Sequence, residues 1–343
     1  LGKLADLHFR LNQWPEALAA WQELLKIRAD CPTTVFAFGE KCYQAGAFEL
    51  AAGAFRRVLE LRPGALNGLL NLGLTLQKLG DFPNALDCVQ RALAISPANG
   101  DIYKVLGDVH RELGHWAQAN AAWEKAIELC PDHADAWQNL GLGLENGLRL
   151  EEALVCHRRV VDLRPGDPKA RRYFGMILQD LGQLGEAEEQ YREALRLDPK
   201  DAESHWQMFS LLASRGDFPQ AWAEHEWRWD LKNRTTPKRE FKQPKWTGED
   251  LAGRAILLYS EQGFGDTIQA VRFAPLVQSR GGRVLVWCPP DLVSLLRTVA
   301  GVSEVFSELT AEIPFDCHFP LMSLPLVFGT TVPTIPNQVP YLR

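Results

Sequence analysis

The sequence predicts an all-α solenoid of helical hairpins followed by an α/β domain with a parallel sheet. Two observations carry this prediction: residues recur at a fixed interval of 34, and the rhythm then changes to alternating strands and helices from Ala255 onward. The recurring alanines are Ala17, Ala51, Ala85, Ala119, Ala153, Ala187 and Ala221. Glycines and prolines recur in the same register at Gly39, Gly73, Gly107, Gly141, Gly175, Pro63, Pro97, Pro131, Pro165 and Pro199.

Each repeating unit is expected to hold two antiparallel helices that approach closely where one side chain is small. The glycine belongs to the first helix and the alanine to the second, and the proline ends the second helix because it has no N–H group. A single unit cannot bury its own apolar face, so neighbouring units stack. Helix-turn-helix units of this period resemble tetratricopeptide repeats.

The register divides the repeats into units at 32–65, 66–99, 100–133, 134–167 and 168–201, with weaker units on either side. Leu1 falls inside a unit and is not Met, so we expect that sequence preceding it has been removed. The last unit is degenerate, because Phe209 replaces the glycine and Arg228 replaces the second small residue. A divergent terminal unit is expected at a cap or at a join to another domain. The predicted domains are a solenoid at 1–235, a linker at 236–253 and a sheet domain at 254–343.

Composition favours a soluble, cytoplasmic protein. The apolar fraction is 46%, yet no run approaches the roughly 18 apolar residues of a membrane helix. Seven cysteines without a C-x-x-C pair argue against a disulfide framework and against a metal site. Residues 1–236 hold 27 basic against 33 acidic side chains, which argues against nucleic acid as a partner.

The segment that follows the repeats is interrupted by Pro237, Pro244 and Gly248 and is expected to be a linker. It carries four tryptophans, which either pin the last repeat to the following domain or form an exposed binding surface. These are Trp222, Trp227, Trp229 and Trp246.

From Ala255 the sequence predicts strands at 255–260, 283–288, 302–307 and 315–320. It predicts helices at 267–282, 290–301 and 321–329. This alternation predicts a parallel sheet with right-handed crossovers. Ligands of such sheets bind at the carboxyl ends of the strands, where the loop from Glu261 to Asp266 lies.

This loop, EQGFGD, fits neither common phosphate motif. It lacks G-K-[ST], and Ile268 stands where a dinucleotide fingerprint has its third glycine. Asp266 would occupy the N-cap of the next helix, and two roles are open for it. It is either a helix cap, worth about 1 kcal/mol, or a general base that takes a proton from a substrate hydroxyl.

The stretches GFGDTIQ and DCHFPLMSLP resemble bacterial proteins in which tetratricopeptide repeats are fused to a glycosyltransferase domain. That domain is of the heptosyltransferase (glycosyltransferase 9) type. The whole plan is similar to that of the O-GlcNAc transferases. The resemblance implies an all-α tetratricopeptide solenoid followed by an α/β Rossmann-like half-domain, the first half of a GT-B type glycosyltransferase. The chain stops at Arg343, where the first half ends, so no cofactor is expected here. A nucleotide-sugar donor is expected for a full-length protein that carries the donor-binding half.

Site roles follow from the same resemblance. It implies that Asp266 is the base and that His318 is either catalytic or a structural histidine at the sheet edge. The implied substrate-binding residues are Glu261, Gln262, Gly263, Gly265, Thr267, Gln269 and Ser323.

The concave face of the repeats, lined by the first helices, is expected to bind an extended peptide. Asn71 and Asn139 occupy the same position in two units, as in the asparagine ladder of the O-GlcNAc transferases, although other residues interrupt the ladder. The predicted groove residues are Asn67, Asn71, Lys104, Asp108, Arg111, Gln138, Asn139 and Arg172.

The sequence therefore supports two alternative functions. The first is a glycosyltransferase, or a fragment of one, in which the repeats select a protein acceptor and the sheet domain offers its hydroxyl to Asp266. The alternative is a non-catalytic scaffold that gathers protein partners in the groove. A lipid-linked sugar acceptor, as in the heptosyltransferases, fits the solenoid less well.

Overall fold

The computed structural model describes residues 8, 13–27, 30–233, 238–310, 313–339 and 341–342. The chain divides into two compact units, 1–165 and 166–343, which are described separately. The expected start of the chain inside a repeat and part of the expected linker, residues 236–237, lie outside the described residues.

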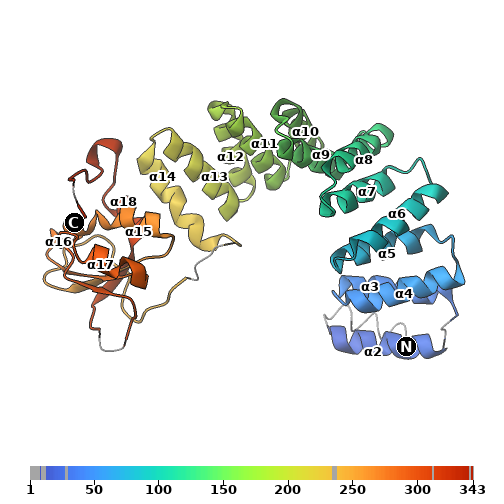
Figure 1. Ribbon diagram of the computed structural model, residues 1–343, viewed down its shortest axis with the longest axis horizontal. Coiled ribbons are helices and arrows are strands. Elements are labelled where there is room, and N and C mark those ends of the chain that lie inside the picture. The colour runs from blue at the N-terminus through green and yellow to red at the C-terminus, as the bar shows by residue number, and fades with distance from the viewer. Residues whose placement is uncertain are drawn as a thin grey trace. The chain divides into compact units, whose positions relative to one another are not determined.

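The first unit is built of helical hairpins that follow the repeat register (Figure 1). After α2 (Trp14–Ile27), every first helix begins 34 residues after the previous one and has 13 residues, which confirms the predicted units. The first helices are α3 (Pro32–Gln44), α5 (Leu66–Lys78), α7 (Gly100–Glu112) and α9 (Ala134–Asn146). The second helices are α4 (Phe48–Leu61), α6 (Phe82–Ile95), α8 (Trp116–Leu129) and α10 (Leu150–Leu163).

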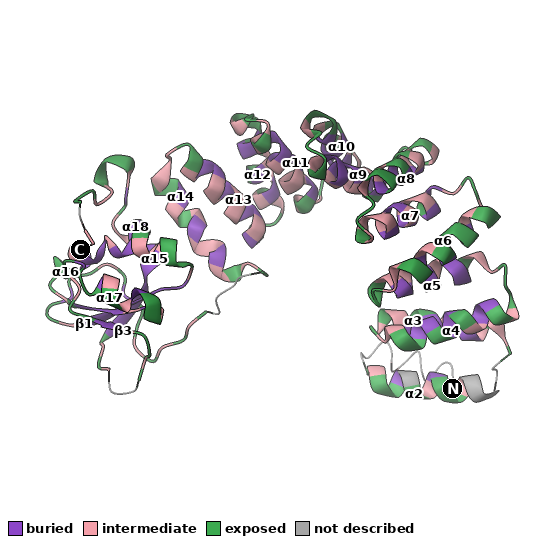
Figure 2. Ribbon diagram, viewed as in Figure 1, coloured by how far each residue is buried: buried purple, intermediate pink, exposed green. Residues whose placement is uncertain are grey.

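Within each hairpin the two helices meet at the predicted glycine. A Cβ atom at Gly107 would lie 2.4 Å from Nε1 of Trp123, and one at Gly39 would lie 2.6 Å from the ring of Phe55. In these two hairpins the glycine makes room for a ring of the second helix, and at Gly73 it makes room for Val89; the recurring alanines of the second helices are buried. In Figure 2 the buried residues lie mainly between paired helices, as expected for stacked units that share their apolar faces.

The turn between the two helices of a hairpin needs a left-handed residue. Glycine fills this position in most repeats, with φ close to 75°, and those glycines are Gly46, Gly80, Gly114, Gly182 and Gly216. Leu148 takes the position in one repeat, with φ of 57° and a side chain that is 82% exposed. A leucine in this conformation is strained, because its Cβ approaches the neighbouring carbonyl oxygen.

The second unit begins with two hairpins. They consist of α11 (Pro168–Asp180), α12 (Leu184–Leu197), α13 (Ala202–Ser214) and α14 (Phe218–His225). The last hairpin is degenerate, as the sequence indicates, because α14 has eight residues and continues into the 3₁₀ helix η1 (Glu226–Asp230).

A four-stranded sheet forms the rest of this unit. Its strands are β1 (Ala255–Tyr259), β2 (Arg283–Trp287), β3 (Glu304–Phe306) and β4 (Cys317–Pro320). They pair in parallel in the order β3-β2-β1-β4, with Leu257 beside both Leu285 and His318. The predicted parallel sheet is therefore confirmed, whereas its membership in a two-domain transferase stays a prediction.

Helices cover one face of this sheet. They are α15 (Phe264–Val271), α16 (Ala274–Gln278), η2 (Pro290–Leu292), α17 (Val293–Leu296), η3 (Leu321–Ser323) and α18 (Leu324–Val327), with η4 (Val332–Thr334) beyond them. The single helix predicted over 267–282 is two short helices, with Phe273 at the break and Pro275 at the start of α16. Proline suits a helix start because its missing N–H needs no partner there. The opposite face packs against Phe241 of the linker.

The tryptophans of the linker region act as anchors. Trp222 donates its indole N–H to the carbonyl of Thr330 at 3.0 Å, and Trp246 is 1% exposed in the core of the sheet domain. Trp227 stacks on His205 with ring centres 3.9 Å apart. Of the two predicted roles, pinning the last repeat to the sheet domain is borne out for Trp222, whereas Trp246 anchors the linker in the core of the sheet domain.

Candidate functional site

The predicted groove residues of the first unit lie on its first helices. These helices contact one another along the unit, α3 with α5, α5 with α7 and α7 with α9. Successive first helices therefore present one continuous face, which we call the inner face.

Three of the predicted groove residues meet at Asp108. Lys104 Nζ lies 2.8 Å from Asp108 Oδ2, and Asn139 donates from Nδ2 to Asp108 Oδ1 at 2.7 Å. Trp123 also donates its indole N–H to Asp108 Oδ1, at 3.1 Å. The carboxylate thus links α7, α8 and α9 and fixes the orientation of the Asn139 amide.

Asn71 is fixed in a different way. Its Nδ2 donates to the carbonyl of Asn67 one turn earlier, at 2.9 Å, and its Oδ1 accepts no hydrogen bond from the described residues. Further along α5, the buried Nε2 of Gln77 also has no acceptor among them.

The other predicted groove residues bind separate partners. Gln138 lies 3.5 Å from Nδ1 of the buried His157, and Arg111 pairs with Glu112 at 2.6 Å. In the second unit, Arg172 pairs with Asp201 at 2.5 Å. The structure therefore gathers Lys104, Asp108 and Asn139 into one cluster and leaves these three outside it.

The glycine loop after β1 differs from the prediction at Asp266. The N-cap of α15 is Gly263, and Asp266 is the third residue of the helix, so the predicted N-cap position was wrong. Its carboxylate is partly exposed, and no hydrogen bond holds it among the described residues. Thr267 is buried and donates its hydroxyl to the carbonyl of Gly263 at 3.1 Å, so it stabilises the first turn.

The remaining loop residues lie nearer to solvent. Gly263, Gly265 and Gln269 are exposed, and Gln262 is partly buried. These positions leave the backbone around Asp266 accessible, whereas Glu261 is 4% exposed.

His318 lies within the edge strand β4, two residues before its end, and not in a loop. Its ring is buried against Phe241, with ring centres 4.3 Å apart, and its Nδ1 has no hydrogen-bond partner among the described residues. Burial, followed by the charge of Lys245, lowers the pKa of His318. The ring of His318 is therefore packed under the linker, and both its catalytic and its structural role stay predictions.

A buried ionic network joins the last repeat to the sheet domain. Arg228 of η1 donates to Glu261 at 2.6 Å, to Ser323 at 2.7 Å and to Glu226 at 2.7 Å. Ser323 in turn donates its hydroxyl to Glu226 at 2.5 Å. Glu261 and Ser323, both predicted to bind substrate, are therefore engaged by a side chain of the repeat region.

Burial shifts the protonation of this network. It raises the pKa of Glu261 to about 7, although Arg228 acts in the opposite direction. Burial, assisted by the charge of Arg228, lowers the pKa of His225 to about 3. The neutral imidazole suits its position, because Nδ1 of His225 lies 3.3 Å from Nη1 of Arg228 and can accept a hydrogen bond from it.

Arg228 occupies the point where ligands of open parallel sheets commonly bind. The strand order reverses between β1 and β4, and the loops that follow these two strands carry Glu261 and Ser323. Because Arg228 contacts both, it fills the space between the two loops. Sequence reasoning noted Arg228 only as a departure from the repeat pattern, and that departure was the available signal.

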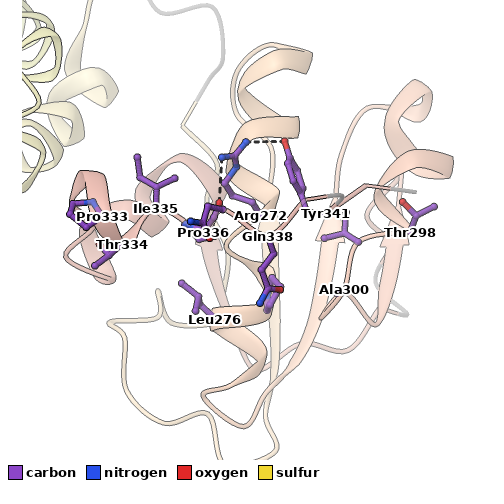
Figure 3. A pocket seen from close by; sticks show the side chains of 13 residues that line it. Arg272, Leu276, Thr298, Ala300, Pro333, Thr334, Ile335, Pro336, Gln338 and Tyr341 are labelled. Carbon is purple, nitrogen blue, oxygen red and sulfur yellow. Dashed lines mark hydrogen bonds between the residues drawn. The ribbon is translucent and has the colours of Figure 1, made fainter.

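A cavity of about 630 Å³ lies elsewhere in the sheet domain, between α16 and the C-terminal segment (Figure 3). Arg272 forms one wall and donates to Oη of Tyr341 at 3.1 Å and to the carbonyl of Pro336 at 3.4 Å. None of the predicted site residues lines this cavity.

Two searches concerned metals and membranes. Among the described residues, no three His, Cys, Asp or Glu side chains are grouped so as to hold a metal ion. No helix in that part of the chain has the length and apolarity to cross a membrane.

Comparison with known families matches most of the repeat region. Two models described as "Tetratricopeptide repeat" match residues 64–132 and residues 3–65 and 104–168, and one described as "TPR repeat" matches 175–208. Together these matches cover more than half of the chain. No curated protein matches the sequence.

Several solved structures share the fold. The pilF protein of Pseudomonas aeruginosa matches with a TM-score of 0.52 and 19% identity, over 59% of this chain and 90% of its own. The APC/C hetero-tetramer Cut9–Hcn1 matches with a TM-score of 0.54 and 15% identity, over 67% of this chain and 46% of its own. YrrB, described as a TPR protein with an unusual peptide-binding site, matches with a TM-score of 0.43 and 22% identity, over 54% of this chain and 95% of its own.

Proposed function

The chain belongs to the tetratricopeptide-repeat proteins, and we propose that it is a scaffold whose inner face binds an extended segment of a protein partner. The observation that carries this proposal is Asn71 on α5, whose side chain is partly exposed and whose Oδ1 has no partner among the described residues. An amide oxygen held in this way can accept a hydrogen bond from a backbone N–H group of a peptide.

The Asp108 cluster supports the same proposal. Asp108 holds Asn139 and Lys104 in fixed positions on neighbouring helices, so little side-chain entropy would be lost on binding. The first unit therefore offers a preorganised polar surface at α7 and α9 and an unpaired acceptor, Asn71 Oδ1, at α5.

Selection from a randomised peptide display library, followed by titration of the selected peptides, tests the proposal. Replacing Asn71 and Lys104 by alanine should weaken binding by at least about tenfold, equivalent to roughly 1.4 kcal/mol. The matched control is Lys125→Ala on the second helix α8, where the lysine side chain is 41% exposed and pairs with Glu128. An equal loss in the control, or unchanged binding in the double variant, would contradict the inner face as the binding surface.

A second candidate function rests on Asp266. Its partly exposed carboxylate has no hydrogen bond among the described residues and lies beside two exposed glycines after a parallel strand. In an inverting transfer, an acceptor hydroxyl would attack the anomeric carbon of a nucleotide-sugar. The bond to the nucleotide diphosphate would break as Asp266 took the hydroxyl proton.

Intact-mass measurement of proteins that co-purify with the full-length gene product tests this second function. A mass increment of a hexose or more that appears with the native residue, and not with Asp266→Asn, supports transfer. If the partners have unmodified mass with both the native residue and Asp266→Asn, only the scaffold function remains supported.

A further inference from the structure

A small cavity of about 170 Å³ lies where β1, β2 and β3 end. It is lined by Ser260 after β1, by Trp287, Cys288 and Pro289 at the end of β2, by Ser307 after β3, and by Arg239 of the linker. The carboxyl ends of parallel strands are the usual ligand edge of such a sheet. This cavity is distinct from the inner face and from the Arg228 network, with which it shares no lining residue.

Arg239 is the charged group of this cavity, and it lacks a counterion. Its guanidinium lies 3.6 Å from the centre of the Trp287 ring, so a cation–π contact holds it over the end of β2. No carboxylate within ion-pair distance of Arg239 is found among the described residues, and its buried Nε has no acceptor there. The adjacent carboxylate of Glu261 is already paired with Arg228.

A partly buried guanidinium without an anion is unfavourable. Burial lowers the pKa of Arg239, yet arginine keeps its proton under all physiological conditions. The charge therefore persists, and an anion that enters the cavity would regain part of the solvation energy lost on burial.

We propose that this cavity binds the phosphate group of a small phosphorylated ligand. The guanidinium can give two parallel N–H bonds to a phosphate, and Ser260 and Ser307, each with a hydroxyl that can donate, line the same cavity. A phosphate has more acceptor oxygens than a carboxylate for these donors. The volume accommodates the phosphate itself, with the rest of the ligand toward solvent.

Calorimetric titration of the whole 343-residue chain at low ionic strength tests the proposal, with inorganic phosphate, pyrophosphate and acetate as probes. We expect saturable binding of phosphate and pyrophosphate and at least tenfold weaker binding of acetate. Arg239→Gln should weaken phosphate binding at least tenfold. The phosphate affinity of Arg239→Lys should lie between those of the native chain and of Arg239→Gln, because lysine keeps the charge but loses the bidentate contact.

The matched control is Arg297→Gln, which removes an exposed arginine of the same domain that has no ion pair among the described residues. It should leave phosphate binding within twofold of the native chain. If Arg239→Gln does not fold, as judged by circular dichroism, Ser260→Ala replaces it and should weaken phosphate binding about threefold or more. The absence of saturable phosphate binding, equal binding of acetate, or equal losses in the Arg297 and Arg239 variants would overturn the proposal.

Discussion

Replacing Arg228 by alanine should detach the last repeat from the sheet domain. The side chain is 4% exposed and its partner Glu261 is 2% exposed, so the change leaves a buried carboxylate without its counterion. Breaking a buried pair in this way typically costs about 3 to 5 kcal/mol. Glu226 and Ser323 also lose their guanidinium contact, and the cation that remains near Glu226, Lys245 at 3.5 Å, is about half exposed.

Hydrogen exchange of the amides in α14 and β1 measures this cost, because unfolding of the whole chain is not expected to be two-state. Protection should fall by roughly 150- to 5,000-fold, at about 1.4 kcal/mol per factor of ten. Arg196→Ala is the control: this arginine is 69% exposed and pairs with Glu193, so its loss should cost less than about 1 kcal/mol.

A double-mutant cycle with Glu261→Ala completes the test. The double variant should be more stable than the sum of the single losses indicates, because each single change leaves a buried charge that the other removes. Additive losses, or a loss for Arg228→Ala no larger than that of the Arg196 control, would refute the account of the network.

Three further predictions concern stability. Gly107→Ala should lower the free energy of unfolding by about 1 to 3 kcal/mol, because the new Cβ would collide with Trp123. Gly53→Ala, on an open face of α4, should instead raise it by about 1 kcal/mol, and thermal unfolding of both variants compares them. Leu148→Gly should raise the free energy of unfolding by about 0.5 to 1 kcal/mol, seen as a higher urea midpoint, because it relieves the left-handed strain; a lower midpoint would contradict this. His225 is neutral in the fold down to a pKa of about 3, so stability should fall as the pH drops from about 6.5 toward 3, with a slope of up to about 1.4 kcal/mol per pH unit. The slope should shrink in His225→Gln, and equal slopes would count against the assignment.

The repeat register was predictable from sequence because each period carries its own local constraints. A glycine under a ring, an alanine in a close contact and a proline after a helix act within one hairpin, so the helix starts at 32, 66, 100, 134 and 168 follow from the spacing. The parallel strands were predictable for a similar reason, since short apolar runs alternate with helical spacing. The break at Phe273 was missed because Pro275 is compatible with the start of a new helix as well as with the interior of a predicted one.

The site was less predictable because its contacts join residues far apart in the chain. Glu261 and Ser323 were correctly placed beside the ends of β1 and β4, but nothing local shows that Arg228 reaches both. Asp266 was placed three residues too early relative to the helix, because a glycine can begin a helix as well as an acidic residue can.

Leu148 and Arg228 both depart from the repeat pattern, and the structure separates two kinds of departure. Leu148 keeps the turn conformation that glycine adopts in the other repeats and exposes 82% of its surface. Arg228 replaces a small residue with a large charged one at the end of the array, and its guanidinium donates to four groups, two of them in the sheet domain. These contacts join the last repeat to the loops that follow β1 and β4. The end of the repeat array is therefore an integral part of the sheet domain, and a cut placed at 235 to isolate that domain would remove the cation that neutralises Glu261.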